Sequence, residues 1–120
     1  MAGTAVLTEP SFRESPVWER TIVYTFASGD DAEVKYALPM NGILQKIVVK
    51  CGSCASANPT ATVAIDDNAD NEIWIVAALA ESTSYKYSVS EPFAGVIDIG
   101  VLPSTDPLSA YIVTVYLRGI

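Results

Sequence analysis

Histidine is absent from this 120-residue sequence, and cysteine occurs only twice. Without histidine the chain lacks the commonest general base, the usual partner of a serine nucleophile and the commonest metal ligand. The seven glycines are isolated, so the sequence has no glycine-rich phosphate loop. Carboxylate pairs stay open as a catalytic alternative, but none of the fourteen acidic residues stands in an informative context. We therefore predict a protein that is not an enzyme and holds no cofactor.

Basic residues are also few, seven against fourteen acidic ones, which gives a net charge of −7. A protein that binds nucleic acid needs a basic stripe to displace counterions from the phosphates. The lysines Lys35, Lys46, Lys50 and Lys86 are scattered singly along the sequence. We predict no nucleic-acid binding, and we expect the acidity to keep an apolar protein soluble or to match a basic surface on a partner.

Long apolar runs are missing as well, since none approaches the roughly 18 residues that a membrane-spanning helix needs. The N-terminal segment has no basic residue ahead of its short apolar stretch, so we expect no signal peptide. Half of the residues are hydrophobic and 18% are charged, which is typical of a packed globular domain. We expect a soluble protein that is made in the cytoplasm and contacts no membrane.

The two cysteines, Cys51 and Cys54, form a Cys-Gly-Ser-Cys sequence. A redox pair at this spacing opens a helix after a strand, and no helical period follows here. A zinc site needs two further Cys or His ligands, which the sequence lacks. Two interpretations stay open: a pair of reduced thiols at the end of a strand, or a local disulfide that closes too short a loop to stabilise much.

From residue 18 onward, apolar and polar residues alternate with the period of two that is typical of half-buried strands. Residues 73–82 contain good helix formers, but their leading Ile-Trp-Ile-Val run is β-branched and aromatic, and we predict a strand. Pro39 and Gly42 predict a turn between two strands. The predicted strands, about eight, cover residues 21–26, 33–38, 43–51, 60–65, 72–79, 84–90, 95–101 and 111–118.

This spacing of short strands and turns predicts an all-β fold, an antiparallel β-sandwich of the jelly-roll type. Residues 1–17 carry two prolines and no sustained period. They predict an extended N-terminal arm ahead of a sandwich domain at residues 18–120. The inward positions of the strands predict a core that contains Ile47, Val49, Val63, Ile65, Ile75, Val113 and Val115.

The acidic segment Asp66–Glu72 has two possible interpretations. Its first, third and fifth residues match the first half of a calcium-binding loop. Asn71 replaces the turn glycine of that loop, however, and Ala77 stands where a bidentate glutamate is needed. We predict instead a metal-free hairpin loop in which Asp and Asn side chains bond the local backbone.

Three aromatic residues, Trp74, Tyr85 and Tyr87, also have two possible roles. If their rings are exposed, they form a platform for a carbohydrate. If they are covered, they are ordinary cross-strand packing, which is the interpretation that we favour.

An ordered series of segments within residues 42–119 resembles the small β-sandwich structural proteins of tailed bacteriophage particles, particularly capsid decoration proteins. The resemblance covers about two-thirds of the chain. The segments are Gly42–Val49, Pro59–Asp67, the acidic turn at 66–72, Phe93–Ile99 and Ala110–Gly119.

This resemblance implies a virion protein that sits on an assembled capsid and stabilises it, often as a trimer, with the major capsid protein or another virion shell protein as partner. The mean hydropathy of +0.30 independently leads us to expect surplus apolar surface and a homo-oligomer. The alternatives are a carbohydrate-binding β-sandwich module and an enzyme that uses carboxylates only. The candidate partner-binding residues are Val6, Leu7, Phe12, Val17, Trp18, Tyr116 and Ile120.

Overall fold

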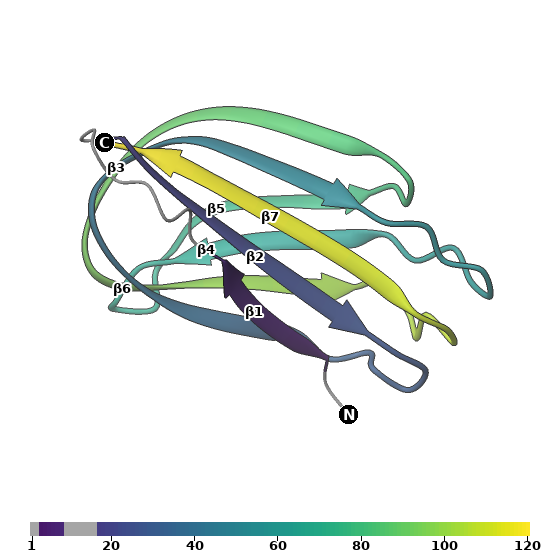
Figure 1. Cartoon of the computed structure of the whole chain (residues 1–120). Coiled ribbons are helices and arrows are strands. Elements are labelled where there is room, and N and C mark those ends of the chain that lie inside the picture. Colours follow the sequence, from purple (N-terminus) through teal and green to yellow (C-terminus); the bar gives the residue numbers. More distant parts are fainter. Residues whose placement is uncertain (1–2, 9–16) are drawn as a thin grey trace.

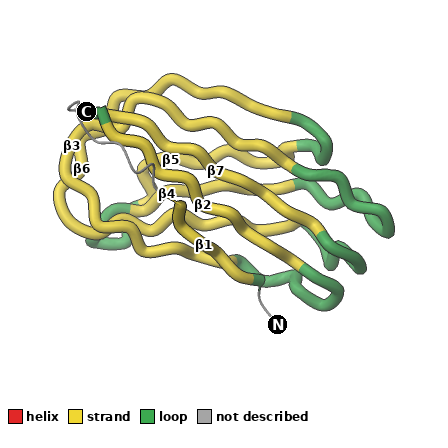
Figure 2. Tube along the Cα trace, in the orientation of Figure 1, coloured by secondary structure: helices red, strands yellow, loops and turns green. Residues whose placement is uncertain are grey.

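The computed structural model describes residues 3–8 and 17–120. In that part of the chain it contains β-strands and no helix (Figures 1 and 2), so it has no helix that is long and apolar enough to cross a membrane. The strands are β1 (Thr4–Thr8), β2 (Trp18–Phe26), β3 (Val34–Cys51), β4 (Ala61–Asp66), β5 (Glu72–Leu79), β6 (Ser84–Pro103) and β7 (Tyr111–Gly119).

All these strands belong to one antiparallel sheet in the order β1-β2-β7-β3-β6-β4-β5. β3 and β6 pair along most of their length and curve together around one end of the molecule (Figure 1). The sheet therefore folds over on itself into two layers. The five-stranded layer contains β1, β2, β7, the second half of β3 and the first half of β6. The four-stranded layer contains the other halves of β3 and β6 with β4 and β5. The predicted antiparallel, jelly-roll-like sandwich is confirmed.

The shared bend of β3 and β6 contains two glycines in unusual conformations. Gly42 has a φ of 143° and Gly95 a φ of 110°, values that residues with a Cβ rarely adopt. A Cβ at Gly42 would lie only 2.4 Å from the carbonyl oxygen of Ile120. Glycine at position 42 thus permits both the bend and the close approach of the C-terminal residue.

The turn predicted at Pro39 and Gly42 is wrong. β3 passes through these residues without a break, and Pro39 lies opposite Val96 on β6. The reason is that β6 follows β3 around the whole bend and continues the pairing. The strands predicted at 84–90 and 95–101 are likewise two halves of β6.

Inward side chains of both layers form one core. The hydroxyl of Tyr24, on β2, donates a hydrogen bond to the carbonyl oxygen of Ile99 in the opposite layer. Burial raises the pKa of Tyr24, so this hydroxyl stays protonated and keeps donating. The predicted core residues with no exposed surface are Ile47, Val49, Val63, Ile65, Val113 and Val115.

The prediction that Ile75 belongs to the core is wrong, since this residue is 51% exposed. Its neighbours on β5, Trp74 and Val76, lie opposite the buried Ile65 and Val63 and pack against the core. Because side chains alternate along a strand, Ile75 points outward.

The sheet begins inside the segment that was predicted as an arm. β1 pairs with β2, and its residues Ala5 and Leu7 pack against the core, while Val6 points outward. Because Ala5 and Leu7 bury their side chains beside the edge of β2, this segment extends the sheet by one strand. The other residues of the predicted arm, apart from Gly3 and Val17, lie outside the described residues.

Candidate functional site

The outer face of the five-stranded layer is the candidate functional site, and we call it the basic face. On this face, residues of β2, β7 and β3 that lie opposite one another form rows across the strands. The face carries five large hydrophobic side chains that are exposed: Val6, Val17, Ile43, Ile112 and Ile120. Three of these rows are Glu19–Arg118–Lys46, Thr21–Tyr116–Val48 and Val23–Thr114–Lys50. At the end of the face next to the bend, Ile120 exchanges two backbone hydrogen bonds with Ile43.

Three lysines converge on this face from two strands. Lys46 and Lys50 flank Val48 on β3, and Val48 lies opposite Lys86 on β6. Residues directly opposite each other are about 5 Å apart and diagonal neighbours about 7–8 Å, so the lysines form a triangle. Within residues 3–8 and 17–120, no ion pair or hydrogen bond engages their amines.

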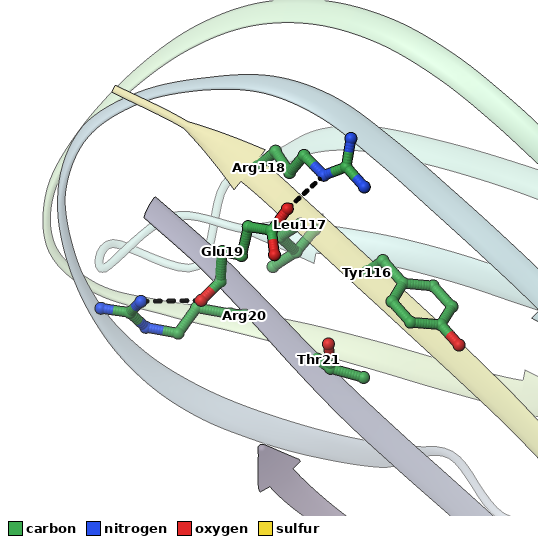
Figure 3. Close-up of a pocket in the computed structure, with 6 residues that line it drawn as sticks. All are labelled: Glu19, Arg20, Thr21, Tyr116, Leu117 and Arg118. Atoms are coloured by element: carbon green, nitrogen blue, oxygen red, sulfur yellow. Dashed lines mark hydrogen bonds and ion pairs between the residues drawn. The ribbon is translucent and has the colours of Figure 1, made fainter. Parts of the chain in front are cut away.

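A shallow depression lies between β2 and β7 on the basic face (Figure 3). Its empty volume is about 170 Å³, part of it open solvent, whereas small-molecule sites measure about 300–1,000 Å³. Glu19 and Arg118 reach across it, with 2.7 Å between Oε1 and Nε. This depression is therefore small for a ligand of typical size. The depression is lined by Glu19, Arg20, Thr21, Tyr116, Leu117 and Arg118.

The structure brings four of the predicted partner-binding residues together on the basic face. Tyr116 lies in its middle, opposite Thr21 on one side and Val48 on the other. Val6 lies on β1 at one edge, and Val17 and Ile120 lie at the end next to the bend of the sheet. They share one outer surface although they come from three separate parts of the sequence.

Two other candidates, Leu7 and Trp18, are not on this surface. Leu7 packs against the core. Trp18 lies opposite Gly119 on the inward side, and the guanidinium of Arg20 lies 5.8 Å from the centre of its ring. Phe12 lies outside the described residues.

The triangle of lysines is the part of the site that the sequence did not predict. Lys46 and Lys50 alternate with buried residues along β3, which indicated that both face outward. Lys86 faces outward on a strand that is distant in sequence. Their convergence depends on the adjacency of β3 and β6, which no local pattern indicates.

The outer face of the four-stranded layer, which we call the acidic face, has the opposite charge. Asp66 and Asp98 lie opposite each other, and the Glu33 carboxylate lies over Gly100. Lys35 Nζ is 3.3 Å from Asp66 Oδ2 and 3.9 Å from Glu33 Oε1. The hydrogen bond with Asp66 and the charge of Glu33 raise the pKa of Lys35. This face also exposes Ile75, Val96 and Leu102.

The aromatic residues considered as a carbohydrate platform close one side of the sandwich instead. Trp74 on β5 and Tyr87 on β6 form an edge-to-face pair with ring centroids 5.2 Å apart. The hydroxyl of Tyr85 accepts a hydrogen bond of 2.9 Å from the amide of Ala80. All three rings are partly buried and pack against the core.

The acidic segment 66–72 is the hairpin between β4 and β5, as predicted. The carboxylate of Asp67 accepts hydrogen bonds from the amides of Ala69 and Asn71, both at 2.9 Å. The backbone and side-chain hydrogen bonds from Asn71 hold the pKa of Asp67 below its usual value. Asp70 takes the left-handed conformation of the turn. No group of three potential metal ligands occurs within the described ranges.

Cys51 and Cys54 are both buried and are free thiols in this structure. The Cys54 thiol donates to the carbonyl oxygen of Pro107 at 3.1 Å and lies 3.5 Å from Ser109 Oγ. The contact with Ser109 lowers the pKa of Cys54, whereas burial raises that of Cys51. The two thiols thus differ in environment although they are close in sequence.

No protein-family model matches this chain, and no curated protein matches it in sequence. Solved structures do match it in fold. The mitogen derived from Yersinia pseudotuberculosis is 8% identical, with a TM-score of 0.51 over 85% of this chain and 86% of the mitogen chain. The appendages of Bacillus endospores, described as disulfide-linked pili, give 11% identity and a TM-score of 0.51 over 99% and 90% of the two chains.

A carbohydrate-binding module of a Cellvibrio mixtus lichenase, solved with cellotriose, is 11% identical. Its TM-score is 0.45, with 99% of this chain and 87% of the module covered. At 8% and 11% identity, the likeness to the mitogen and to the endospore appendages shows a shared fold alone, and it assigns neither ligand nor partner.

Proposed function

We propose that the chain is a non-enzymatic structural protein of a bacteriophage virion, a decoration protein that binds the assembled capsid and stabilises it. The basic face is the observation that carries the proposal. It combines exposed hydrophobic side chains with lysines that have no partner among the described residues, and the depression between β2 and β7 on it is small. The sequence resemblance to capsid decoration proteins supports the same role.

In this proposal the partner is the major capsid protein or another virion shell protein. The protein is made in the host cytoplasm and ends in the virion, where it acts as a homo-oligomer. The carbohydrate-binding alternative has less support, because Trp74, Tyr85 and Tyr87 pack against the core instead of forming an exposed platform.

The test is cosedimentation of the purified protein with capsids that lack it, prepared from the phage whose genome encodes the chain. Lys86→Glu places a carboxylate next to Lys46 and Lys50, so it should weaken capsid binding at least about tenfold. Lys35→Glu makes the same change on the acidic face and is the matched control, which should bind like the wild type.

Equal loss of binding in the two variants would remove the basic face from the proposal. Absence of the wild-type protein from the capsid pellet, together with a signal on a glycan array, would favour the carbohydrate-binding alternative.

A further inference from the structure

The two broad outer faces of the sandwich are complementary in charge. The basic face holds the three lysines and Arg118 against a single acidic residue, Glu19, among its described residues. The acidic face holds Asp66, Asp98 and Glu33 around one lysine. With four basic groups and one acidic group, the described residues of the basic face carry a net charge of +3, although the whole chain carries −7.

The two faces also match in their apolar content and size. Each exposes several β-branched or leucine side chains beside its charged cluster. The Cα trace extends 42 × 30 × 21 Å, and its two longer dimensions leave room for broad outer faces. Faces of this breadth can supply the roughly 800 Å² per partner of a standard interface.

From this complementarity we propose that the basic face of one copy docks on the acidic face of a second copy of the same chain. The inference rests on the proposed role of the basic face in docking: within a row of copies this face is covered by the next copy, and at the end of the row it stays free for the capsid. Lysines of one copy then approach Asp98, Asp66 and Glu33 of the next, while the exposed hydrophobic side chains of both faces are removed from water.

The geometry of the faces decides the form of the assembly. Because the two contact surfaces differ, the interface is heterologous, and each added copy leaves one free face at either end. A closed trimer needs contact surfaces that are inclined around a threefold axis. The two faces lie on opposite sides of the sandwich, so copies stack into an open row.

Salt dependence gives the first experiment. In light scattering, the wild-type protein should grow in mass with concentration at an ionic strength of about 0.01 M and return toward the monomer near 1 M, because the Debye length falls from about 30 to about 3 Å. A monomer at every concentration at low salt, or a discrete trimer, would overturn the proposal.

Two variants test which faces meet. The basic-face variant carries K46E, K50E and K86E, and the acidic-face variant carries E33Q, K35Q, D66N and D98N. Each variant alone should associate at least about tenfold more weakly than the wild type. Their mixture should form a one-to-one pair and nothing larger, because each still carries one intact face. Circular dichroism should give the same spectrum for both variants and the wild type.

The matched control is D31N with D70N, two exposed acids in turns outside both faces, which should associate like the wild type. If the two face variants do not pair when mixed, the interface is not heterologous and the proposal fails. A wild-type protein that stays monomeric but still binds capsids, with loss in K86E, would refute stacking and leave the proposed function intact.

Discussion

The two outer faces of the sandwich belong to one continuous sheet, yet they carry opposite charges. The basic face gathers Lys46, Lys50 and Lys86, and the acidic face places Asp66 opposite Asp98. On their inward sides the same strands present apolar side chains, because an unpaired charge in the core is costly. Folding therefore constrains the inner surfaces of both layers, whereas the outer surfaces can diverge for binding.

We expect the greatest loss of stability when an inward isoleucine is truncated, and a much smaller loss at an outward one. Ile65 has no exposed surface and Ile75 is 51% exposed, on adjacent strands. Ile65→Ala leaves a cavity and should lower the free energy of unfolding by about 2–5 kcal/mol. Ile75→Ala should cost less than about 1 kcal/mol. Urea denaturation measures both, and similar losses would mean that Ile75 is covered in solution.

This pair of residues also illustrates how far sequence alone predicts the fold. Alternation placed Ile47, Val49, Val63 and Ile65 in the core, because one buried face imposes a period of two. In the run Ile-Trp-Ile-Val of β5 every residue is apolar, so the pattern does not reveal which side chains face inward. The pairing with β4 decides it, and that pairing is not a local property.

A smaller loss is expected at the bend that the two layers share. Gly42→Ala forces a Cβ to within 2.4 Å of a backbone oxygen of Ile120, whereas at Gly95 the nearest atom is the side-chain nitrogen of Asn68 at 3.1 Å. Both substitutions carry the penalty of a positive φ. Gly42→Ala should cost about 1–3 kcal/mol and Gly95→Ala less, as measured by thermal melting. The reverse order would contradict the role given to Gly42.

Acid should weaken the contact between the loop that follows β2 and the loop that follows β6. The carboxylate of Asp106 accepts hydrogen bonds of 2.9 Å from the amides of Gly29 and Leu108, which lower its pKa. A lowered folded-state pKa contributes stability that is complete above the unfolded value of about 3.9 and is lost as the pH falls through the folded value. The melting temperature of the wild type should therefore fall as the pH drops below about 3.9, and it should fall less steeply in Asp106→Asn. Identical acid profiles of variant and wild type would exclude this contribution.

The candidate site was only partly predictable. Val6, Val17, Tyr116 and Ile120 were identified because apolar residues in these segments needed cover. The lysines were treated as scattered, since sequence distance hides neighbours that come together only when β6 pairs with β3. A charge cluster on a sheet is a property of strand order, which places β6 next to β3 here.

Replacing one lysine on each outer face should change stability least, and with opposite signs on the two faces. Lys86 lies diagonally across from Lys46 and Lys50, and like charges on neighbouring strands repel each other. Lys86→Gln should therefore raise the free energy of unfolding of the monomer by about 0.2–0.5 kcal/mol at low salt, and the gain should disappear near 1 M salt. Lys35 is held between Asp66 and Glu33 instead, so Lys35→Gln should lower the melting temperature. Urea and thermal denaturation of the two variants, at a protein concentration where the wild type is monomeric, measure this contrast. A loss of stability in Lys86→Gln would mean that this lysine has a stabilising partner within the monomer. A gain would mean that the basic face retains a charge which the isolated fold does not need, as expected of a surface that serves binding.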